Sequence, residues 1–366
     1  MSSGDAALAQ AGRPPRPEPP VSFFEFWPRW LFYAPVVAHC AALGLRYLSP
    51  VVLTAANPRI ASGGLCGESK TSILDQVEGE ERALLARYTT VCVAGTAEDL
   101  AAAERAMAAA GLAYPVVAKP DVGCNGTGVR VARGPAALAS YLAAFPREER
   151  VVLQELIPFE NEAGIFYVRH PDDAQGRITS ITLKETPFVV GDGRRRLREL
   201  ILDDPRAGRV AHLYLPRLIH RLERVPSQGT RVPLVFVGNH CKGAIFRDGA
   251  SHITPALTER IERLARAIPE FHFGRIDVRF ASLAALRRGE AFRVIEVNGA
   301  GSEATHVWDP RTTLLRAWRD QFLHYGLAYR IGAANRARGA RPTGVRELFR
   351  LWRTQRRLMA AYPLHD

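Results

Sequence analysis

Cysteine is scarce in this sequence, and its distribution argues against two kinds of architecture. Five cysteines are scattered over 366 residues, and no two of them have CxxC spacing. A disulfide framework or a structural zinc site would need paired or closely spaced cysteines. The N-terminus also lacks the basic region followed by an apolar region that marks a secretory signal. We therefore expect a reducing, cytoplasmic environment.

Long hydrophobic runs are also missing. The most apolar stretch, residues 23–58, is interrupted by Pro35, His39 and Arg46, so no run in it reaches the length of a membrane-spanning helix. Its many aromatic residues leave two interpretations open. We favour a helix packed against the protein core, and the alternative is a segment seated at a membrane interface.

The familiar nucleotide-binding motifs are absent as well. The segment PVVAKPDVGCNGTGV, Pro115 to Val129, has neither the GK[ST] of a P-loop nor the spacing of the dinucleotide fingerprint. It does have an apolar strand ending at Lys119, followed by a loop with Gly123, Gly126 and Gly128. Glycines let backbone N–H groups approach phosphates, and a lysine adds a point charge. The segment predicts a phosphate-covering loop, with a flexible hairpin turn as the alternative.

A second segment, VVLQELIPFENEAGIFYV, runs from Val151 to Val168 and predicts a strand followed by a hinge. An adenine ring fits an apolar slot that offers one or two hydrogen bonds at its edge. The hinge has this composition, and a glutamate seven residues after its own glutamate is placed to accept hydrogen bonds from ribose. The residues predicted for this role are Gln154, Glu155, Leu156, Ile157 and Glu162.

Carboxylates interrupt two further strand-like runs. In FRVIEVNGAGSEATHVWDP, Phe292 to Pro310, Glu296 and Asn298 share one strand face because side chains alternate. The run FGRIDVRF, Phe273 to Phe280, carries Asp277, which an antiparallel pairing would set close to Glu296. Their oxygen atoms suit Mg²⁺. The pattern predicts a magnesium site beside nucleotide phosphates, with two polar strand ends in solvent as the alternative.

The order of these segments resembles the ATP-grasp superfamily, and most closely its D-alanine–D-alanine ligase branch. The resemblance covers residues 67–310 and includes GRID at Gly274–Asp277 and EVNG at Glu296–Gly299. The stretch KETPFVVGDGRRRLRELI, residues 184–201, resembles a segment of cyanophycin synthetase. Lys70, in GESKTSILDQV, stands where the family has its first nucleotide lysine.

The resemblance implies an α+β, ATP-grasp fold in which two α+β subdomains clasp ATP. Because Lys70 comes early in the chain, a reduced or atypical N-terminal domain is expected. The predicted organisation is a disordered proline-rich tail (1–20), an atypical N-terminal region and linker (21–110), a small ATP-grasp subdomain (111–183), a C-terminal ATP-grasp subdomain with the metal site (184–330) and a basic amphipathic C-terminal helix (331–366).

The resemblance also implies an ATP- and Mg²⁺-dependent ligase that activates a carboxylate as an acyl phosphate and joins it to an amine. Arg275, two residues before Asp277 on the same strand face, is placed to stabilise an oxyanion or the transferring phosphoryl group. The loop GSEATH lacks the serine pair expected for D-alanine, so D-alanine is not assigned. The implied roles are catalytic for Arg275 and Lys184; nucleotide binding for Lys70, Lys119, the three loop glycines and the hinge residues; binding of two Mg²⁺ ions, or of Mn²⁺, for Asp277, Glu296 and Asn298; and substrate binding for Gly299, Ser302 and His306.

Positive charge is concentrated near the C-terminus, where residues 316–357 contain eleven arginines and two acidic residues. The segment GVRELFRLWRTQRRLM, residues 344–359, spaces its apolar residues for one helix face and predicts an amphipathic helix. Its arginine face is a solvated surface by default, and the alternatives are a contact for anionic lipid at the inner membrane surface or for an acidic polymer. Nucleic acid ranks last because no recognised nucleic-acid fold accompanies the basic run. The apolar face is predicted to consist of Val345, Leu348, Phe349, Trp352 and Met359.

The expected partners are a small carboxylate and a small amine. Two other functions stay open at this point. One is an ATP-grasp phosphotransferase that acts on a hydroxyl or another small acceptor. The other is a non-catalytic nucleotide-binding protein at a membrane surface.

Overall fold

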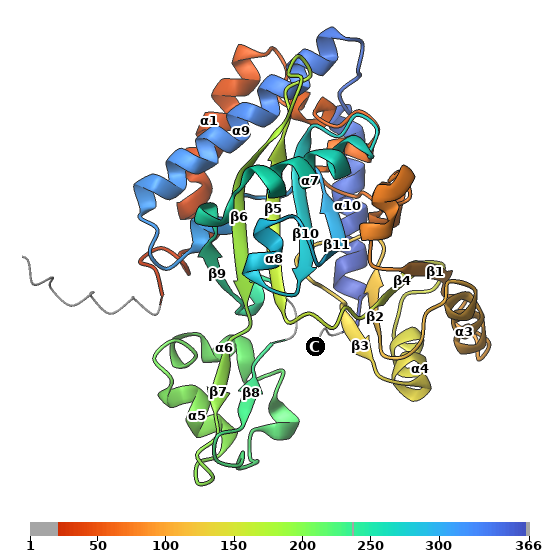
Figure 1. The fold of residues 1–366 in the computed structure, drawn as a ribbon, viewed down its shortest axis with the longest axis vertical. Helices are drawn as coiled ribbons and strands as arrows, with labels where there is room; N and C mark the ends of the chain where they lie inside the picture. The colour runs from red at the N-terminus through yellow and green to blue at the C-terminus, as the bar shows by residue number, and fades with distance from the viewer. Residues whose placement is uncertain (1–20, 236–237, 364–366) are drawn as a thin grey trace, which may run out of the picture.

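Two antiparallel sheets dominate the computed structural model, which describes residues 21–235 and 238–363 (Figure 1). The central sheet has the strand order β11–β10–β5–β6–β9, and a smaller sheet has the order β1–β4–β2–β3. A lobe built on the two-stranded sheet β7–β8 is inserted between β6 and β9. Paired strands in all three sheets run antiparallel. The predicted α+β class is confirmed.

The elements have the following bounds. The strands are β1 (Tyr88–Cys92), β2 (Val116–Pro120), β3 (Arg130–Ala132), β4 (Arg150–Glu155), β5 (Asn161–Val168), β6 (Arg177–Glu185), β7 (Phe188–Val190), β8 (Arg231–Pro233), β9 (Ile245–Asp248), β10 (Phe273–Phe280) and β11 (Phe292–Asn298). The α-helices are α1 (Arg29–Arg46), α2 (Lys70–Leu74), α3 (Asp99–Ala109), α4 (Pro135–Ala143), α5 (Leu197–Asp203), α6 (Ala211–Tyr214), α7 (Pro255–Arg266), α8 (Leu283–Arg287), α9 (Leu314–Ala337) and α10 (Val345–Ala361). The short 3₁₀ helices are η1 (Val52–Ala55), η2 (Ala61–Gly64), η3 (Gly79–Leu84), η4 (Gly208–Val210), η5 (Ile219–Arg221), η6 (His240–Lys242), η7 (Ala250–His252) and η8 (Thr305–Trp308).

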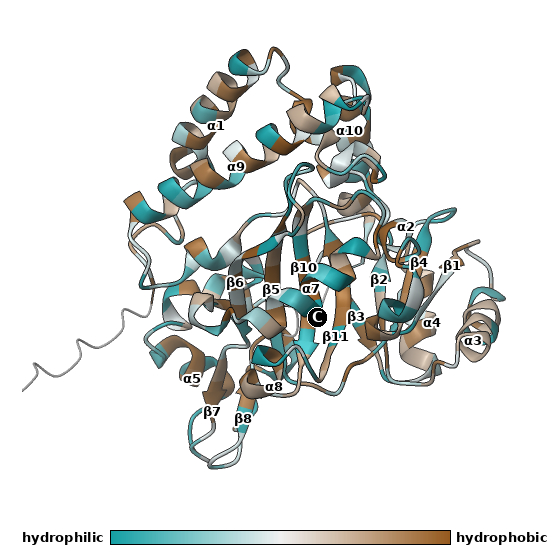
Figure 2. Cartoon of the chain, turned by 45° about the horizontal axis from the view of Figure 1, so that its top comes forward, coloured by the Kyte–Doolittle hydropathy of each residue, from teal (hydrophilic) through white to brown (hydrophobic). Residues whose placement is uncertain are grey.

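Helix α7 illustrates how the sequence builds the central layer. Thr254 caps it by accepting a hydrogen bond from the backbone N–H of Leu257 at 3.2 Å, and Pro255 occupies the first turn. Leu257, Ile261 and Leu264 recur at helical spacing and are buried. This face packs against β5 and β6, while the outer face of α7 is largely hydrophilic in Figure 2.

The small sheet has its own apolar core, to which the C-terminal helix contributes. Leu358 and Tyr362, at and beyond the end of α10, are buried against residues of α4 and β2. The Tyr362 hydroxyl donates to the Val122 carbonyl at 2.8 Å, and the Gln355 side chain accepts from the Gly67 N–H at 2.6 Å. Helix α10 therefore braces the glycine-rich segment that follows β2.

The predicted C-terminal helix is confirmed, but the predicted apolar face is only partly packed. Val345, Phe349 and Trp352 of that face are 60%, 56% and 42% exposed, so this part of it does not pack on the protein. The residues of α10 that pack on the core of the small sheet are Leu358 and Met359. Membrane contact by the exposed stripe stays a prediction.

The aromatic N-terminal stretch packs on the protein, as the favoured interpretation expects. Phe24 and Phe32 are buried beside Val307 and Ala317, and α1 lies along α9 (Figure 1). Within the described ranges, no helix combines the length and apolarity needed to cross a bilayer. The predicted disordered tail, residues 1–20, lies outside the described residues, and the predicted domain boundaries stay predictions.

Candidate active site

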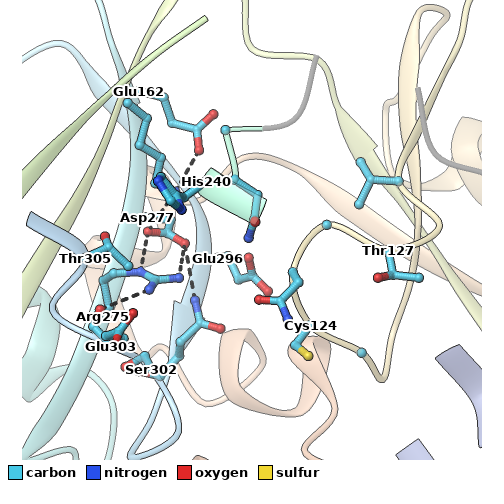
Figure 3. A pocket seen from close by; sticks show the side chains of 18 of the residues that line it. Cys124, Thr127, Glu162, His240, Arg275, Asp277, Glu296, Ser302, Glu303 and Thr305 are labelled. Atoms are coloured by element: carbon cyan, nitrogen blue, oxygen red, sulfur yellow. Dashed lines mark hydrogen bonds and ion pairs between the residues drawn. The ribbon is translucent and has the colours of Figure 1, made fainter. Parts of the chain in front are cut away.

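A cavity of about 610 Å³ opens where the central sheet, the small sheet, the β7–β8 lobe and the N-terminal segment meet. Strands β10 and β11 supply its polar wall, and the glycine loop, residues 123–128, faces that wall (Figure 3). Most of the predicted site residues line the cavity, although they come from segments up to about 230 residues apart. The members are Lys70, Lys119, Gly123, Gly126, Gln154, Glu155, Leu156, Ile157, Glu162, Lys184, Arg275, Asp277, Glu296, Asn298 and Ser302.

The register of β10 and β11 places the acidic residues as the sequence predicts. Asp277 is directly opposite Glu296, and Arg275 is opposite Asn298. A register shift follows Asp277, between it and Val278, so the ladder is irregular just beyond the acidic pair. The predicted antiparallel pairing of Asp277 with Glu296 is confirmed.

Asp277 is the centre of a buried ion-pair cluster. Arg275 donates to both of its oxygens, from Nε to Oδ1 at 2.9 Å and from Nη2 to Oδ2 at 3.1 Å. The Lys184 ammonium lies 3.2 Å from Oδ1. Burial would raise the pKa of Asp277, but Arg275 and Lys184 outweigh burial and lower it. Asp277 therefore stays ionised and fixes both predicted catalytic cations.

Lys184 also reaches Glu162, the residue predicted to contact ribose. Its ammonium donates to Glu162 Oε1 at 2.8 Å, and Arg279 lies 3.8 Å from Oε2. Burial lowers the pKa of Lys184, but the charges of Asp277 and Glu162 reverse the shift and raise it. In this arrangement Glu162 holds Lys184, so a hydrogen bond from ribose would have to share that carboxylate.

Three of the chain's four lysines line the cavity, in a protein that otherwise uses arginine for its positive charge. Lys70 begins α2 and donates to the Gly123 carbonyl at 2.5 Å, with Glu296 Oε1 3.7 Å away. Lys119, buried on β2, donates to Gln154 Oε1 at 2.8 Å and to the Ile295 carbonyl at 3.0 Å. Burial lowers the pKa of Lys119 to about 8. Two ammonium groups thus stand near the glycine loop.

The predicted hinge follows β4 along the cavity wall. The side chain of Gln154 is already engaged by Lys119, and Glu155 pairs with Arg87 at 3.3 Å. Although burial alone would raise it, the pKa of Glu155 is lowered because Arg87 donates to the carboxylate. Apolar walls beside the hinge come from Val117, Val129, Leu156, Ile157 and Ile295.

Three predicted site residues lie outside the described cavity lining. Gly128 packs against Pro120 and Tyr362, and its φ of +73° explains the need for glycine there. Gly299 backs onto the Ser62–Gly64 turn, where a Cβ would lie 2.4 Å from the Gly63 carbonyl. His306 is buried and points to Asp320, with Nε2 3.1 Å from Oδ2. Of the three residues predicted to bind substrate, only Ser302 reaches the cavity, although Gly301, Glu303 and Thr305 of the same loop also line it.

Sequence reasoning missed several lining residues. Glu68, two positions before Lys70, has a buried carboxylate oxygen without a hydrogen-bond partner, and burial raises its pKa. Its position in GESK next to a predicted nucleotide lysine was a usable signal. The N-terminal segment Glu25–Tyr33 and His240 of the lobe also line the cavity. Nothing local in the sequence predicts that these two distant segments meet.

A divalent cation can be tested against the donors that face the cavity. Within the described ranges, no group of three or more His, Cys, Asp or Glu side chains is arranged to hold a metal ion. Glu296 and Asn298 offer oxygens on one strand face. The Glu68 carboxylate, one oxygen of which has no hydrogen-bond partner, is close enough to Glu296 for the two carboxylates to interact. This oxygen-rich set fits a hard cation such as Mg²⁺. Asp277 fits less well, because Arg275 and Lys184 already hold its oxygens.

Comparison with known proteins gives matches only at the level of solved structures, since no family model and no curated protein sequence matches. Similar structures include a bifunctional glutathione synthetase from Pasteurella multocida, with 18% identity over 69% of this chain and 36% of that chain and a TM-score of 0.34. An ATP-grasp ligase in complex with a minimal precursor matches with 14% identity over 72% of this chain and 60% of that chain, at a TM-score of 0.35. The D-alanine–D-alanine ligase from Coxiella burnetii matches with 9% identity over 81% and 64% of the two chains, at a TM-score of 0.40.

The ligases that the sequence motifs resemble are thus among the matched structures. The chain spans 36% to 48% of the length of the first three solved structures it matches. At these identities and TM-scores, the matches assign no reaction or substrate to this chain. The basis for function lies in its own side chains.

Proposed function

We propose that this protein is an ATP-dependent ligase that activates a carboxylate as an acyl phosphate and joins it to an amine. The observation that carries the proposal is the convergence of four cationic side chains on one cavity wall and loop. Lys70, Lys119, Lys184 and Arg275 all line the cavity, together with the glycine loop, Glu296 and Asn298. Phosphoryl transfer requires positioning and charge neutralisation, and this set supplies both.

The nucleotide would lie between the glycine loop and the hinge. Lys70 and Lys119 would contact its phosphates, and the apolar hinge would hold the adenine. Glu296 and Asn298 would hold Mg²⁺, which supplies positive charge at the phosphates when it is bound. The Lys119 ammonium already bridges β2, β4 and β11 through Gln154 and Ile295, so it is held in place before the nucleotide arrives.

The chemistry would proceed in two displacements. A carboxylate oxygen of the acid attacks the γ-phosphorus of ATP and ADP leaves, which gives the acyl phosphate. The amine nitrogen then attacks the acyl carbon, phosphate leaves, and the nitrogen releases a proton. Arg275, held rigidly by Asp277 through two hydrogen bonds, would stabilise the developing oxyanion in either step.

The reaction type is tested by product analysis. Purified protein is incubated with ATP, Mg²⁺ and a panel of carboxylic acids, with and without amines, and the products are identified by mass spectrometry. The proposal expects ADP, phosphate and an amide, and hydroxylamine should trap the acyl phosphate as a hydroxamate. A stable phosphorylated acceptor would instead establish the phosphotransferase alternative.

The site is tested by Glu296→Gln, which keeps size and removes one negative charge. If Glu296 holds Mg²⁺ during phosphoryl transfer, ADP release should fall on the order of 10²–10³-fold, with the fold retained. Glu290→Gln is the matched control, because Glu290 is an exposed surface residue paired with Arg288. An unchanged rate and an unchanged magnesium dependence in Glu296→Gln would remove Glu296 from the site.

A further inference from the structure

The end of the cavity away from the glycine loop is lined by aromatic rings from three separate parts of the chain. The N-terminal segment contributes four of them, the stretch after the lobe contributes one, and η8 contributes one. These rings are Phe26, Trp27, Phe32, Tyr33, Phe246 and Trp308. Four of these rings, Trp27, Phe32, Tyr33 and Trp308, also belong to a core cluster, so the cavity opens directly onto packed aromatic side chains.

Two of the rings, Phe26 and Trp308, stack on the His240 ring. The Phe26 and His240 rings are nearly parallel, at 15° and 5.7 Å between centroids, and His240 stacks on Trp308 at 20° and 5.2 Å. Trp308 then contacts Phe32 at 4.6 Å. Offset and parallel ring contacts of this kind favour a flat apolar guest. Phe26 is 41% exposed, so the stack has an edge from which such a guest can enter.

Buried charges fix this end of the cavity. The Glu25 side chain is fully buried, accepts from Arg206 at 2.5 Å and lies 2.9 Å from His240 Nε2. These contacts join the N-terminal segment to the β7–β8 lobe and hold His240 between its two ring neighbours. Charge-assisted hydrogen bonds in a buried setting are the stronger kind, so the ring geometry is set before a ligand binds.

The carboxylates at this end are already engaged. Glu303 accepts from the Tyr33 hydroxyl at 2.7 Å, from Trp308 Nε1 at 2.8 Å and from Gln321 at 2.5 Å. Glu25 is held as described above. These contacts fix the Glu303 side chain and the Tyr33 and Trp308 rings relative to one another, and a flat ring can lie against them without breaking any of the hydrogen bonds. The aromatic end therefore suits a planar part of a ligand.

The aromatic end adjoins the proposed reaction centre. Arg275 Nη1 donates to the Glu303 carbonyl at 3.2 Å, so the residue that anchors the rings also anchors the guanidinium. A carboxylate placed at Arg275 would direct the rest of its molecule toward Trp308 and Phe26. We propose that the carboxylic acid substrate carries an aromatic ring, which binds against the Phe26–His240–Trp308 stack. This inference rests on the proposed function for the identity of the reacting group, but the binding it describes does not require turnover.

The test measures binding and turnover separately. Benzoate, phenylacetate and cinnamate are compared with acetate, propionate and butyrate by calorimetry on the full chain without ATP, and then as substrates for ADP release. Phe26→Ala removes one ring of the stack at a position that is 41% exposed. Phe23→Ala is the matched control, since Phe23 is 79% exposed and is not among the lining residues.

The proposal expects aromatic acids to bind more tightly than aliphatic ones. Phe26→Ala should weaken aromatic binding by about tenfold, leave ATP binding unchanged and differ from Phe23→Ala. Aromatic binding with this dependence but no amide product would leave the inference standing and overturn the ligase proposal. Amide formation from small aliphatic acids, unaffected by Phe26→Ala, would overturn the inference and leave the ligase proposal intact. If no aromatic acid binds, the inference fails.

Discussion

At the residue scale, the choice of lysine over arginine stands out. The chain has four lysines among its 49 basic Lys and Arg residues, and three of the four line the cavity. An ammonium group is compact and its pKa responds to burial. A guanidinium group stays charged and can donate to two acceptor atoms at once. Arg275, one of the arginines at the site, grips the Asp277 carboxylate through two of its nitrogens. The two residue types are thus used for different tasks.

Lys119 should make nucleotide binding depend on pH. Burial lowers its pKa to about 8, so the side chain is a cation below this value and neutral above it. ATP affinity should therefore be highest below about pH 8 and fall by roughly tenfold between about pH 7 and about pH 9. Calorimetry across this range, in buffers of different ionisation enthalpy, should also detect proton uptake on binding.

Lys119→Met should bind ATP weakly at every pH, and its ATP affinity should no longer depend on pH. Lys242→Met is the control, since Lys242 is the one lysine that is not among the lining residues. If Lys119→Met keeps both the affinity and the pH profile of the parent, Lys119 does not contact the phosphates.

The acidic residues show what could be predicted at this scale and what could not. The strand pattern around Asp277 and Glu296 was sufficient to predict their pairing, because β-branched runs and alternation specify a register. It could not predict that Asp277 is enclosed by Arg275 and Lys184, since Lys184 comes from β6, two strands away. Nor did the loop after β11 reveal that His306 turns toward Asp320 on α9, because that contact depends on where a helix packs.

At the scale of elements, α10 and the glycine loop form one unit. Tyr362 donates to the Val122 carbonyl just before the loop, and Met359 lies beside Cys124 within it, with the two sulfur atoms 3.6 Å apart. A glycine loop gains its reach from backbone freedom and loses entropy when it closes on phosphates. Bracing from α10 reduces that loss by limiting the open conformations.

Tyr362→Phe tests this bracing, because it removes one hydroxyl and keeps the ring packed on Phe145. The lost hydrogen bond should cost about 1 kcal/mol, mostly expressed as a higher KM for ATP rather than as a lower kcat. Tyr47→Phe is the control, since Tyr47 is half-buried beside Tyr329, far along the chain from the loop. A parent-like KM in Tyr362→Phe would show that α10 does not restrain the loop.

The outer stripe of α10 leads to a separate prediction. Val345, Phe349 and Trp352 are exposed beside a row of arginines, and Arg356 lies over the Trp352 ring at 4.9 Å. Aromatic and basic residues on one helix face favour an anionic bilayer surface. The protein should therefore sediment with anionic vesicles, but not with neutral ones, and salt should release it.

Phe349→Ser combined with Trp352→Ser should abolish that sedimentation. Leu323→Ser, at an exposed apolar position on α9, is the matched control and should sediment like the parent. Recovery of the parent protein in the supernatant with both lipids would assign the stripe to an ordinary solvated surface.

At the scale of the whole molecule, the cavity exists because distant segments close over it. Glu25 meets His240 across 215 positions and Arg206 across 181. Local pattern predicted individual strands and the pairing of Asp277 with Glu296, but it carries no information on contacts at such separation, so the lobe and the N-terminal segment were missed as parts of the site. The N-terminal segment packs on the protein through Phe24 and Phe32, as predicted, and it also lines the cavity through its neighbouring residues.

A buried histidine next to the core of the central sheet should make global stability depend on pH. His324, on α9, packs its ring against Phe166 and Phe273, with centroids 4.8 and 4.9 Å away. Burial lowers its pKa from 6.5 to about 3, with His306 and Arg275 adding to the shift. The folded state keeps it neutral while the unfolded chain takes up a proton near pH 6.5, so stability is full above that value and falls as pH drops toward about 3. His324 alone should lower the free energy of unfolding by about 2 kcal/mol when the pH falls from about 7 to about 5.

Urea unfolding of His324→Phe at these two pH values tests this expectation. The phenyl ring fits among the same aromatic neighbours and cannot be protonated, so the acid-induced loss should shrink by about 2 kcal/mol. A loss from His272 should remain, because burial lowers the pKa of that histidine to about 4 in the same direction. His212→Gln, at an exposed position, is the control and should show the same dependence of the free energy of unfolding on pH as the parent. If His324→Phe loses as much stability on acidification as the parent, the buried imidazole does not cause the loss of stability at low pH. Protonation of the carboxylate cluster around Asp277 would then be the cause to test.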